Sequence, residues 1–235
     1  MGTFLVEGGH RLDGRIRPAG NKNAALPCLA AAVLAAEPVH FSNVPRIRDV
    51  LTFLEIVQSL GAEVTWNGPN EVTVAAAGVE TDSINEELAG RIRASVLLAG
   101  PLLARFGHVQ LPPPGGDVIG RRRMDTHFLA FEALGAELSL NGGFSITART
   151  LKGADFFLDE PSVTGTENAV MAAVLAEGET TIRNAAAEPH VQDLCNLLNA
   201  MGARISGIGT HMLRIEGVRE LGGATFRIGP DHIET

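Results

Sequence analysis

The densest group of ionisable side chains lies in a loop that neither a helix nor a strand favours. The run that begins at Pro112 opens with three prolines and two glycines and then contains Asp117, Arg121–Arg123, Asp125 and His127. Proline lacks a backbone donor and glycine loses the most entropy on ordering, so this segment suits an irregular loop. Long loops of this kind often carry function, and the alternative is a surface loop whose arginines simply face water.

A second set of candidate groups stands where three apolar helices are expected to begin. Lys22 and Asn23 come before the first, Arg93 and Ser95 come near the start of the second, and 162–166 precede the third. A helix N-terminus has free N–H groups and the positive end of the helix dipole, which together attract anions. If the three helices are parallel, their N-termini meet at one end of the domain.

The proline-rich loop is placed to arch over that same end. The sequence therefore predicts a pocket with Lys22, Arg93 and Arg122 as cations and Asp117 as an acid. Such a pocket suits a small molecule that carries two or three phosphate groups. The sequence has neither a phosphate-binding P-loop nor the cysteine and histidine spacing of a zinc site, and it has no nucleophile elbow. We expect no metal and no cofactor.

Each candidate residue also has a simpler interpretation. Lys22 is equally consistent with a solvated residue before a helix, and Arg93 with a partner of Glu87 or with a residue that faces water. Asp125 suits a helix N-cap. His127, one turn into a helix, is often structural. These alternatives stay open at the level of sequence.

Composition narrows the class of protein. The 235 residues are 45% hydrophobic with a net charge of −8, which indicates a globular chain and argues against non-specific nucleic-acid binding. Cys28 and Cys195 both lie in apolar helical patterns and suit buried thiols, although a disulfide between them is not excluded. The sequence shows neither a signal peptide nor an apolar run long enough to cross a bilayer, so we expect a cytoplasmic protein without a membrane partner.

The chain repeats one order of elements three times: an apolar helix, a strand, an amphipathic helix and a hairpin. The repeats cover about 21–78, 84–150 and 160–218, and the apolar helices are expected at 24–36, 94–106 and 167–176. A helix that is apolar on every side must be buried on every side. Three of them can bury one another only at a common centre, which predicts an α/β domain of three repeats around central helices.

Both ends of the chain fall outside the three repeats. Short strands are expected at 3–6, 15–18 and 225–228. The last segment begins a strand and then continues as a loop with no capping element. We therefore expect both ends to belong to another structural unit.

Five motifs resemble those of UDP-N-acetylglucosamine enolpyruvyl transferases, a family of 1-carboxyvinyltransferases. The motifs cover 20–27 (GNKNAALP), 93–95 (RAS), 114–120 (PGGDVIG), 184–189 and 230–235. The sister family, which acts on shikimate 3-phosphate, is typified by a Ser-Lys-Ser motif near the N-terminus, and this motif is absent here. The resemblance implies an inside-out α/β barrel and a second barrel domain, with the active site in the cleft between them. Residues 21–224 would then be the first, substrate-binding domain. Residues 1–20 and 225–235 would be strands of a missing second domain, which is the implied structural partner.

The resemblance also implies a reaction and roles for individual residues. The enolpyruvyl group of phosphoenolpyruvate would pass to the 3-hydroxyl of UDP-N-acetylglucosamine, phosphate would leave, and peptidoglycan synthesis would begin. The implied catalytic residues are Asp117, which would be the proton donor, together with Lys22 and Arg122. The implied substrate-binding residues are Lys22, Asn23, Arg93, Arg122, Arg123, Met124, Asp125, Thr126, His127, Ser162 and Val163.

Two positions depart from the family pattern. Asp117 stands where the family usually has cysteine, so the thiol that fosfomycin alkylates is missing and we expect insensitivity to that compound. Glu160 stands where the family tends to have lysine beside the UDP phosphates. Two other functions remain open: a non-catalytic ligand-binding or interaction protein that keeps the fold, and 3-phosphoshikimate 1-carboxyvinyltransferase.

Overall fold

The structure is a computed structural model that describes residues 3–11, 13–81, 83–116, 123–139 and 143–233. The helices and strands of these residues follow the expected order in three successive groups, with two short additional elements at 86–89 and 155–157. The first group consists of α1 (Lys22–Ala31), the 3-10 turn η1 (Ala32–Leu34), β1 (Val39–Ser42), α2 (Arg48–Ser59), β2 (Glu63–Gly68) and β3 (Glu71–Ala75). The second consists of α3 (Glu86–Ala89), the 3-10 helix η2 (Arg93–Leu98), α4 (Ala99–Phe106), β4 (His108–Leu111), α5 (Asp125–Ala133), β5 (Glu137–Ser139) and β6 (Phe144–Thr147). The third consists of β7 (Asp155–Phe157), α6 (Val163–Ala173), β8 (Glu179–Arg183), α7 (Pro189–Ala200), β9 (Arg204–Ser206), β10 (Met212–Glu216) and β11 (Ala224–Arg227).

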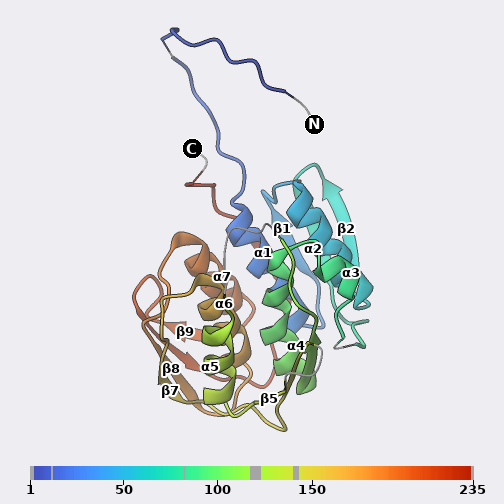
Figure 1. Ribbon diagram of the computed structural model, residues 1–235, viewed down its shortest axis with the longest axis vertical. Helices are drawn as coiled ribbons and strands as arrows, with labels where there is room; N and C mark the ends of the chain where they lie inside the picture. Colours follow the sequence, from blue (N-terminus) through green and yellow to red (C-terminus); the bar gives the residue numbers. More distant parts are fainter. Residues whose placement is uncertain (1–2, 12, 82, 117–122, 140–142, 234–235) are drawn as a thin grey trace.

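The first apolar helix of each group lies in the interior, as its composition predicts. Residues 24–31 of α1 are all buried, and so are 165–173 of α6. Figure 1 shows α1, α4 and α6 in the middle of the body with strands toward the outside. In that core α6 packs against α4 and η2, and η2 packs against α1. Cys28 and Cys195 are both buried free thiols, so no disulfide joins them.

Three sheets surround the helices. Their strand orders are β11-β1-β3-β2, β7-β8-β10-β9 and β4-β6-β5. Most neighbours are antiparallel, whereas β11 pairs with β1 and β7 with β8 in parallel, with Phe41 opposite Phe226 in the first case. The strand expected at 225–228 therefore lies at 224–227, and it completes the first sheet of the body. The expectation that this strand belongs to another unit was wrong, because β1 offers it an edge to pair with.

The second apolar helix is not continuous, contrary to the expectation for 94–106. It runs as a 3-10 helix to Leu98 and only then becomes α-helical. An α-helix would pair the N–H of Gly100 with the carbonyl of Val96. The Asn168 side chain replaces that bond, since its Oδ1 accepts from the Gly100 N–H at 2.7 Å and its Nδ2 donates to the Val96 oxygen at 3.1 Å. Pro101 has no N–H for the next carbonyl, so the ladder is interrupted twice in succession.

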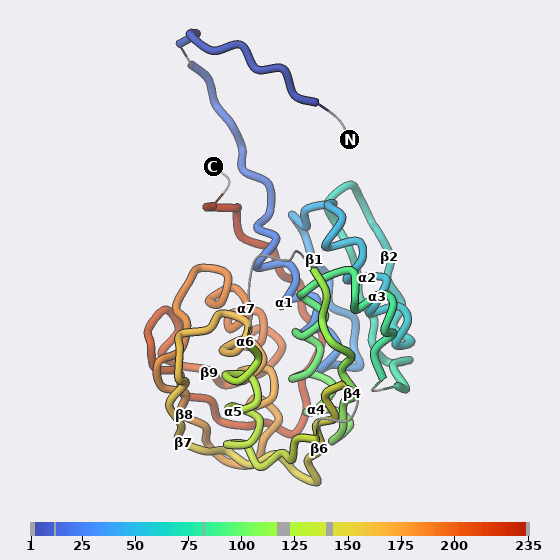
Figure 2. The backbone as a smooth tube through the Cα atoms, viewed as in Figure 1, coloured from blue at the N-terminus to red at the C-terminus, as the bar shows by residue number. Residues whose placement is uncertain are grey.

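The N-terminal segment extends away from the body. The strands expected at 3–6 and 15–18 do not form in the described residues, because a strand needs a hydrogen-bonded neighbour and none of the described residues supplies one there. Figure 2 shows this segment leaving the body beside the C-terminal segment. Gly20 and Pro230 form an antiparallel bridge, and the Asn21 N–H donates to the Gly229 oxygen at 2.9 Å.

Candidate functional site

One pocket brings together the starts of the three interior helices. It has a volume of about 530 Å³ and is lined by the first residues of α1, η2 and α6 together with groups from α2, α7 and the loop after β4. Its lining residues are Lys22, Asn23, Leu26, Pro27, Asp49, Arg91, Ile92, Arg93, Ala94, Leu97, Gly116, Val163, Thr164, Glu167 and His190. The expectation that the three N-termini meet at one end is confirmed for these residues.

Asn21 fixes the start of α1. Its Oδ1 accepts hydrogen bonds from the backbone N–H groups of Asn23 at 2.7 Å and Ala24 at 3.1 Å, which is ordinary N-cap geometry. This cap places Lys22 and Asn23 in the first turn, at the wall of the pocket. Lys22 Nζ lies 3.2 Å from Asp49 Oδ2, and the two side chains are 40% and 45% exposed. Lys22 is therefore held at the mouth by a partner that an incoming anion would compete with.

The arginines near η2 have distinct partners. Arg91 Nη2 lies 2.5 Å from Glu87 Oε1, and Arg91 Nη1 lies 3.8 Å from Glu55 Oε2. Glu87 therefore pairs with Arg91. The sequence was also consistent with a pair between Glu87 and Arg93. Arg93 donates to the Arg123 carbonyl at 3.4 Å. This contact joins the pocket to the segment 123–127.

The segment 123–127 docks on the start of α6. Thr126 Oγ1 donates to Asp159 Oδ1 at 2.6 Å, and His127 Nε2 lies 3.0 Å from Thr164 Oγ1. Asp125 is the first residue of α5, and Met124 is its N-cap, so the N-cap interpretation of Asp125 was wrong. Instead Asp125 Oδ2 accepts from Arg123 Nε at 2.6 Å.

His127 is held neutral in this position. It is buried, and burial lowers its pKa from 6.5 to about 4, with the positive charge of Arg93 acting in the same direction. A neutral imidazole can both donate and accept a hydrogen bond. His127 therefore adds no charge to the pocket at neutral pH and acts through hydrogen bonds alone.

Ser162 caps α6 and completes the third N-terminus. Its Oγ accepts from the Gly165 N–H at 3.2 Å, and Val163 and Thr164 then line the pocket. The helix begins four residues earlier than the apolar pattern predicts, because the cap and not the first apolar run sets the boundary. Glu160 is exposed, and its N–H donates to Asp159 Oδ1 at 3.1 Å.

The described start of the proline-rich loop packs against the same region. The Gly115 N–H donates to the Ala89 carbonyl at 3.1 Å, and a Cβ at Gly115 would lie 1.7 Å from the Gly90 oxygen. Only glycine allows so close an approach of two backbones. Gly116 then lines the pocket. Two residues expected in the site, Asp117 and Arg122, lie outside the described residues.

The comparisons with known proteins agree with this architecture. The family model described as EPSP synthase (3-phosphoshikimate 1-carboxyvinyltransferase) matches residues 6–235. The chain belongs to the EPSP synthase family. Two curated relatives named UDP-N-acetylglucosamine 1-carboxyvinyltransferase come from Bradyrhizobium diazoefficiens and Treponema denticola. They are 58% and 55% identical over 98% and 100% of this chain, and they are matched over 54% and 55% of their own length. The chain thus spans about half the length of these EPSP synthase family relatives.

Solved structures of the EPSP synthase family have the same mixed α/β fold. The enolpyruvyl transferase NikO from Streptomyces tendae superposes with a TM-score of 0.84 at 25% identity, over 97% of this chain and 54% of that one. EPSP synthase from Acinetobacter baumannii gives a TM-score of 0.72 at 21% identity, over 92% of this chain and 50% of that one. The enolpyruvyl transferase fold is therefore shared with these family members.

Glu167 and His190 are among the lining residues that were not predicted from sequence. Their side chains are almost fully buried, and Glu167 Oε1 and His190 Nδ1 have no hydrogen-bond partner within the described part of the chain. Burial raises the pKa of Glu167 well above its usual value, and the charge of Glu188 adds to that rise. Burial lowers the pKa of His190. The available signal was a polar pair, Glu167–Asn168, at the head of an otherwise apolar helix.

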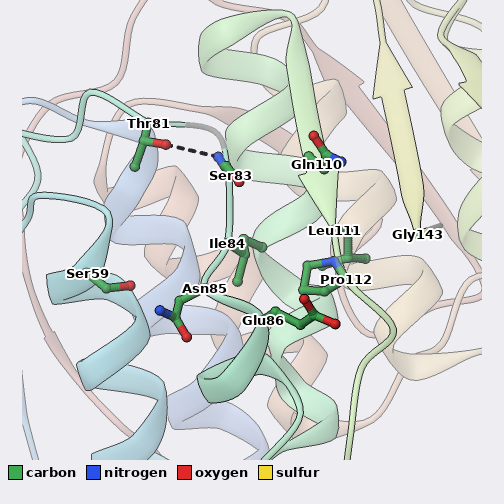
Figure 3. A pocket seen from close by; sticks show the side chains of 10 residues that line it. All are labelled: Ser59, Thr81, Ser83, Ile84, Asn85, Glu86, Gln110, Leu111, Pro112 and Gly143. Carbon is green, nitrogen blue, oxygen red and sulfur yellow. Dashed lines mark hydrogen bonds between the residues drawn. The ribbon is translucent and has the colours of Figure 1, made fainter. Parts of the chain in front are cut away.

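A second pocket differs in its chemistry. It lies between the end of α2, the segment 81–86 and the end of β4, and Figure 3 shows the side chains that line it. Thr81 Oγ1 accepts from the Ser83 N–H at 3.1 Å within it. Its described lining contains Glu86 but neither lysine, arginine nor histidine, so this pocket does not attract anions.

The described residues form neither a metal-binding cluster nor a membrane-spanning helix. No group of three or more histidine, cysteine, aspartate or glutamate residues among them is arranged to hold a metal ion. None of the helices they form is long and apolar enough to cross a membrane.

Proposed function

We propose that this chain is the substrate-binding half of a UDP-N-acetylglucosamine 1-carboxyvinyltransferase. The observation that carries the proposal is the pocket at the three helix N-termini, with Lys22 and Arg93 in its wall. Three sets of backbone N–H groups and two cations suit a ligand with several phosphate charges. The name of relatives that are 58% and 55% identical to this chain supplies the candidate substrates.

In this proposal the sugar nucleotide and phosphoenolpyruvate share the pocket. Lys22, Asn23 and Arg122 bind phosphoenolpyruvate. The residues that hold UDP-N-acetylglucosamine are Arg93, Arg122, Arg123, Met124, Asp125, Thr126, His127, Ser162 and Val163. The contacts of Thr126 with Asp159 and of His127 with Thr164 support a common surface, because they tie α5 to the start of α6.

The reaction then follows from charge neutralisation. The 3-hydroxyl of the sugar adds to C2 of the enol phosphate while Asp117, as a carboxylic acid, delivers a proton to C3. In the next step the bond from C2 to the phosphate oxygen breaks and C3 returns a proton to the Asp117 carboxylate, which restores the double bond. The proton of the sugar hydroxyl leaves with the phosphate, and the enolpyruvyl ether remains on the sugar. Lys22 and Arg122 stabilise the phosphate charge throughout, which is electrostatic preorganisation. No cofactor enters this scheme.

We also propose that residues 21–224, together with the rest of β11, form an inside-out α/β barrel that faces a second barrel domain. The three groups of elements around buried helices support the barrel. Residues 3–19 and those beyond Pro230 would connect to the second domain, which supplies the other side of the cleft. The exposed side chains of Phe4, Leu5 and Val6 fit strands that become buried when that domain is present.

Isothermal titration calorimetry of the chain with UDP-N-acetylglucosamine tests the proposal. We expect saturable binding that is weakened about tenfold or more in Arg93→Ala, since charge-assisted hydrogen bonds contribute about 1.5–3 kcal/mol. Arg149→Ala, an exposed arginine outside the pocket, is the matched control and leaves the affinity unchanged. Tighter binding of shikimate 3-phosphate would favour the sister enzyme, and binding of neither ligand would favour a non-catalytic protein.

Turnover is tested in a protein that pairs this chain with a second barrel domain. Phosphate release from phosphoenolpyruvate should then require UDP-N-acetylglucosamine. Asp117→Ala should abolish release, whereas Asp117→Cys should preserve it and introduce sensitivity to fosfomycin. A covalent fosfomycin adduct on the protein with Asp117 intact would contradict the role given to this residue.

A further inference from the structure

Glu167 occupies an unusual place in the wall of the helix N-terminal pocket. It lies one turn into α6, is 1% exposed, and lines the pocket beside Val163 and Thr164. Its Oε1 atom has less than 1 Å² of accessible surface and no hydrogen-bond partner among the residues that the structure describes. A buried carboxyl group left in this way is costly unless a ligand completes its hydrogen bonds.

The neighbours of Glu167 favour its uncharged form. Its electrostatic neighbours are Glu188 at the N-cap of α7, Cys28 in α1 and Cys195 in α7, and each of these is neutral or negative. Burial is the largest cause that raises the pKa of Glu167, and Glu188 comes second. None of the described cations is among the causes that act on it. A protonated carboxyl group is a hydrogen-bond donor.

The charges of the pocket are arranged at its mouth. Lys22 and Arg91 there are 40% and 45% exposed and are paired with Asp49 and Glu87. In the same pocket Glu167 from α6 and His190 from α7 carry buried polar atoms, and His190 is 6% exposed. The pocket thus has a partly exposed, charged mouth, which includes Arg93, and a buried wall where the pKa values of Glu167 and His190 are both shifted toward the uncharged form. An anion attracted to the mouth would meet hydrogen-bond donors at that wall.

We propose that Glu167, as a neutral carboxylic acid, donates a hydrogen bond to an oxygen of the anionic ligand bound in this pocket. The ligand group is a phosphate or carboxylate oxygen, because the mouth selects for negative charge and the carboxyl proton needs an acceptor. An ionised Glu167 would repel the same group. This inference rests on the proposed function for the ligand class, and it assigns Glu167 a role in ligand positioning.

His190 is placed to donate a second hydrogen bond to the same ligand. His190 lines the pocket, its Nδ1 atom is buried without a described partner, and its ring stacks on His232 with centroids 5.9 Å apart. A neutral imidazole offers one donor. The ligand oxygen would then be bound from two neighbouring helices, α6 and α7.

Difference infrared spectroscopy tests the protonation state directly. The chain at pH 7 should show the carbonyl stretch of a protonated carboxyl group, and this band should be absent in Glu167→Gln. Addition of inorganic phosphate, phosphoenolpyruvate or UDP-N-acetylglucosamine should shift the band. A merely structural carboxyl group would show no shift. The proposal is overturned if the band is absent at pH 7 or does not respond to a ligand that binds.

Affinity measurements on two variants show whether Glu167 acts as a hydrogen-bond donor or as a negative charge. Glu167→Gln keeps a neutral donor and should bind the same three ligands within about threefold of the unaltered chain. Glu167→Leu removes the donor and should bind about tenfold more weakly. Glu63 is exposed on β2, and Glu63→Gln and Glu63→Leu are the matched controls. Neither control should change the affinity for any of the three ligands. Circular dichroism establishes that each variant is folded.

The outcomes distinguish this inference from the proposed function. Equal binding by Glu167→Leu and the unaltered chain overturns the role of Glu167 alone. Tenfold tighter binding by Glu167→Gln does so as well, because it would reveal a charged carboxylate. Phosphate binding that depends on Glu167, with no binding of UDP-N-acetylglucosamine, supports the donor and overturns the proposed substrate. Failure of all three ligands to bind overturns both.

Discussion

Glu167 and Asn168 are adjacent, buried and polar, yet α6 presents them to different surroundings. Asn168 Oδ1 and Nδ2 both have backbone partners, at Gly100, Val96 and Thr164. Glu167 Oε1 has none in the described structure and lies at a pocket. A buried polar group whose hydrogen bonds are complete stabilises the fold, whereas one that is incomplete beside a cavity is a candidate for ligand binding. One helix thus carries both kinds of group at consecutive positions.

The largest effect is expected on the structural side of this comparison. Asn168→Leu should lower the free energy of unfolding by about 4 kcal/mol. The Gly100 N–H loses the acceptor that Asn168 Oδ1 supplies, and an unpaired buried group costs about 1–3 kcal/mol. The bonds from Asn168 Nδ2 to the Val96 and Thr164 carbonyls are lost as well, at about 0.5–1.5 kcal/mol each, although the Val96 carbonyl still accepts from the Ala99 N–H. Urea denaturation measures the change. Asn67→Ala, at an exposed position on β2, is the control and should change stability by less than about 0.5 kcal/mol. A similar loss in both variants would remove the distinction between Asn168 and a surface amide.

His127 is an intermediate case, since Nε2 has a partner in Thr164 and Nδ1 has none among the described residues. Its folded-state pKa of about 4 lies below the usual 6.5, so the unfolded chain binds a proton first as pH falls. Stability should therefore decrease between pH 6.5 and pH 4, by about 3 kcal/mol at the rate of 1.36 kcal/mol per unit. In His127→Gln this part of the decrease should disappear from urea denaturation curves. An unchanged pH profile would mean that His127 is not held neutral.

Glu167 should affect stability with the opposite sign. Its folded-state pKa is raised above 4.5, so the folded chain keeps a proton that the unfolded chain loses. The stability this group contributes is complete below pH 4.5 and is lost as pH rises toward the folded-state pKa, by at most about 1.4 kcal/mol per pH unit. Glu167→Gln should thus gain stability relative to the unaltered chain as pH increases. A constant difference between the two proteins from pH 5 to pH 8 would contradict a protonated Glu167.

The smallest effect is expected at the mouth of the pocket. Lys22 and Asp49 form an ion pair 3.2 Å long between half-exposed side chains, and such pairs contribute about 0.2–1 kcal/mol. Asp49→Asn should therefore change stability by less than about 1 kcal/mol. It should also strengthen anion binding, because Lys22 no longer has a competing carboxylate. Calorimetry with inorganic phosphate measures this, and weaker binding in the variant would be contrary to expectation.

Much of the fold followed from the pattern of apolar residues. The helix at 24–31 has no polar face, so its burial was predictable from composition alone. A Gly-Ala pair directly follows the C-cap of each amphipathic helix, at 61–62, 135–136 and 202–203. The 3-10 start of the second interior helix was not predictable. It depends on Asn168, which lies 68 residues from Gly100 in the sequence.

The part of the site that lies at the starts of the interior helices was predictable from sequence. Lys22, Asn23, Arg93 and Val163 all line the pocket, as their positions at helix starts indicate. Glu167 and His190 were missed, because burial and the lack of a partner are properties of three-dimensional packing and leave little trace in sequence. Strand 225–228 was assigned to another unit for a similar reason, since its partner β1 lies far away in the chain.

The bridge between Gly20 and Pro230 means that the backbone enters and leaves the body at one point. A body closed in this way can be cut and rejoined without loss of its internal contacts. A circular permutant that links residues 19 and 231 and opens in the exposed turn after β9 should keep the same three sheets. Because the two ends of the body lie side by side, the body could also be inserted as a domain into a loop of another protein.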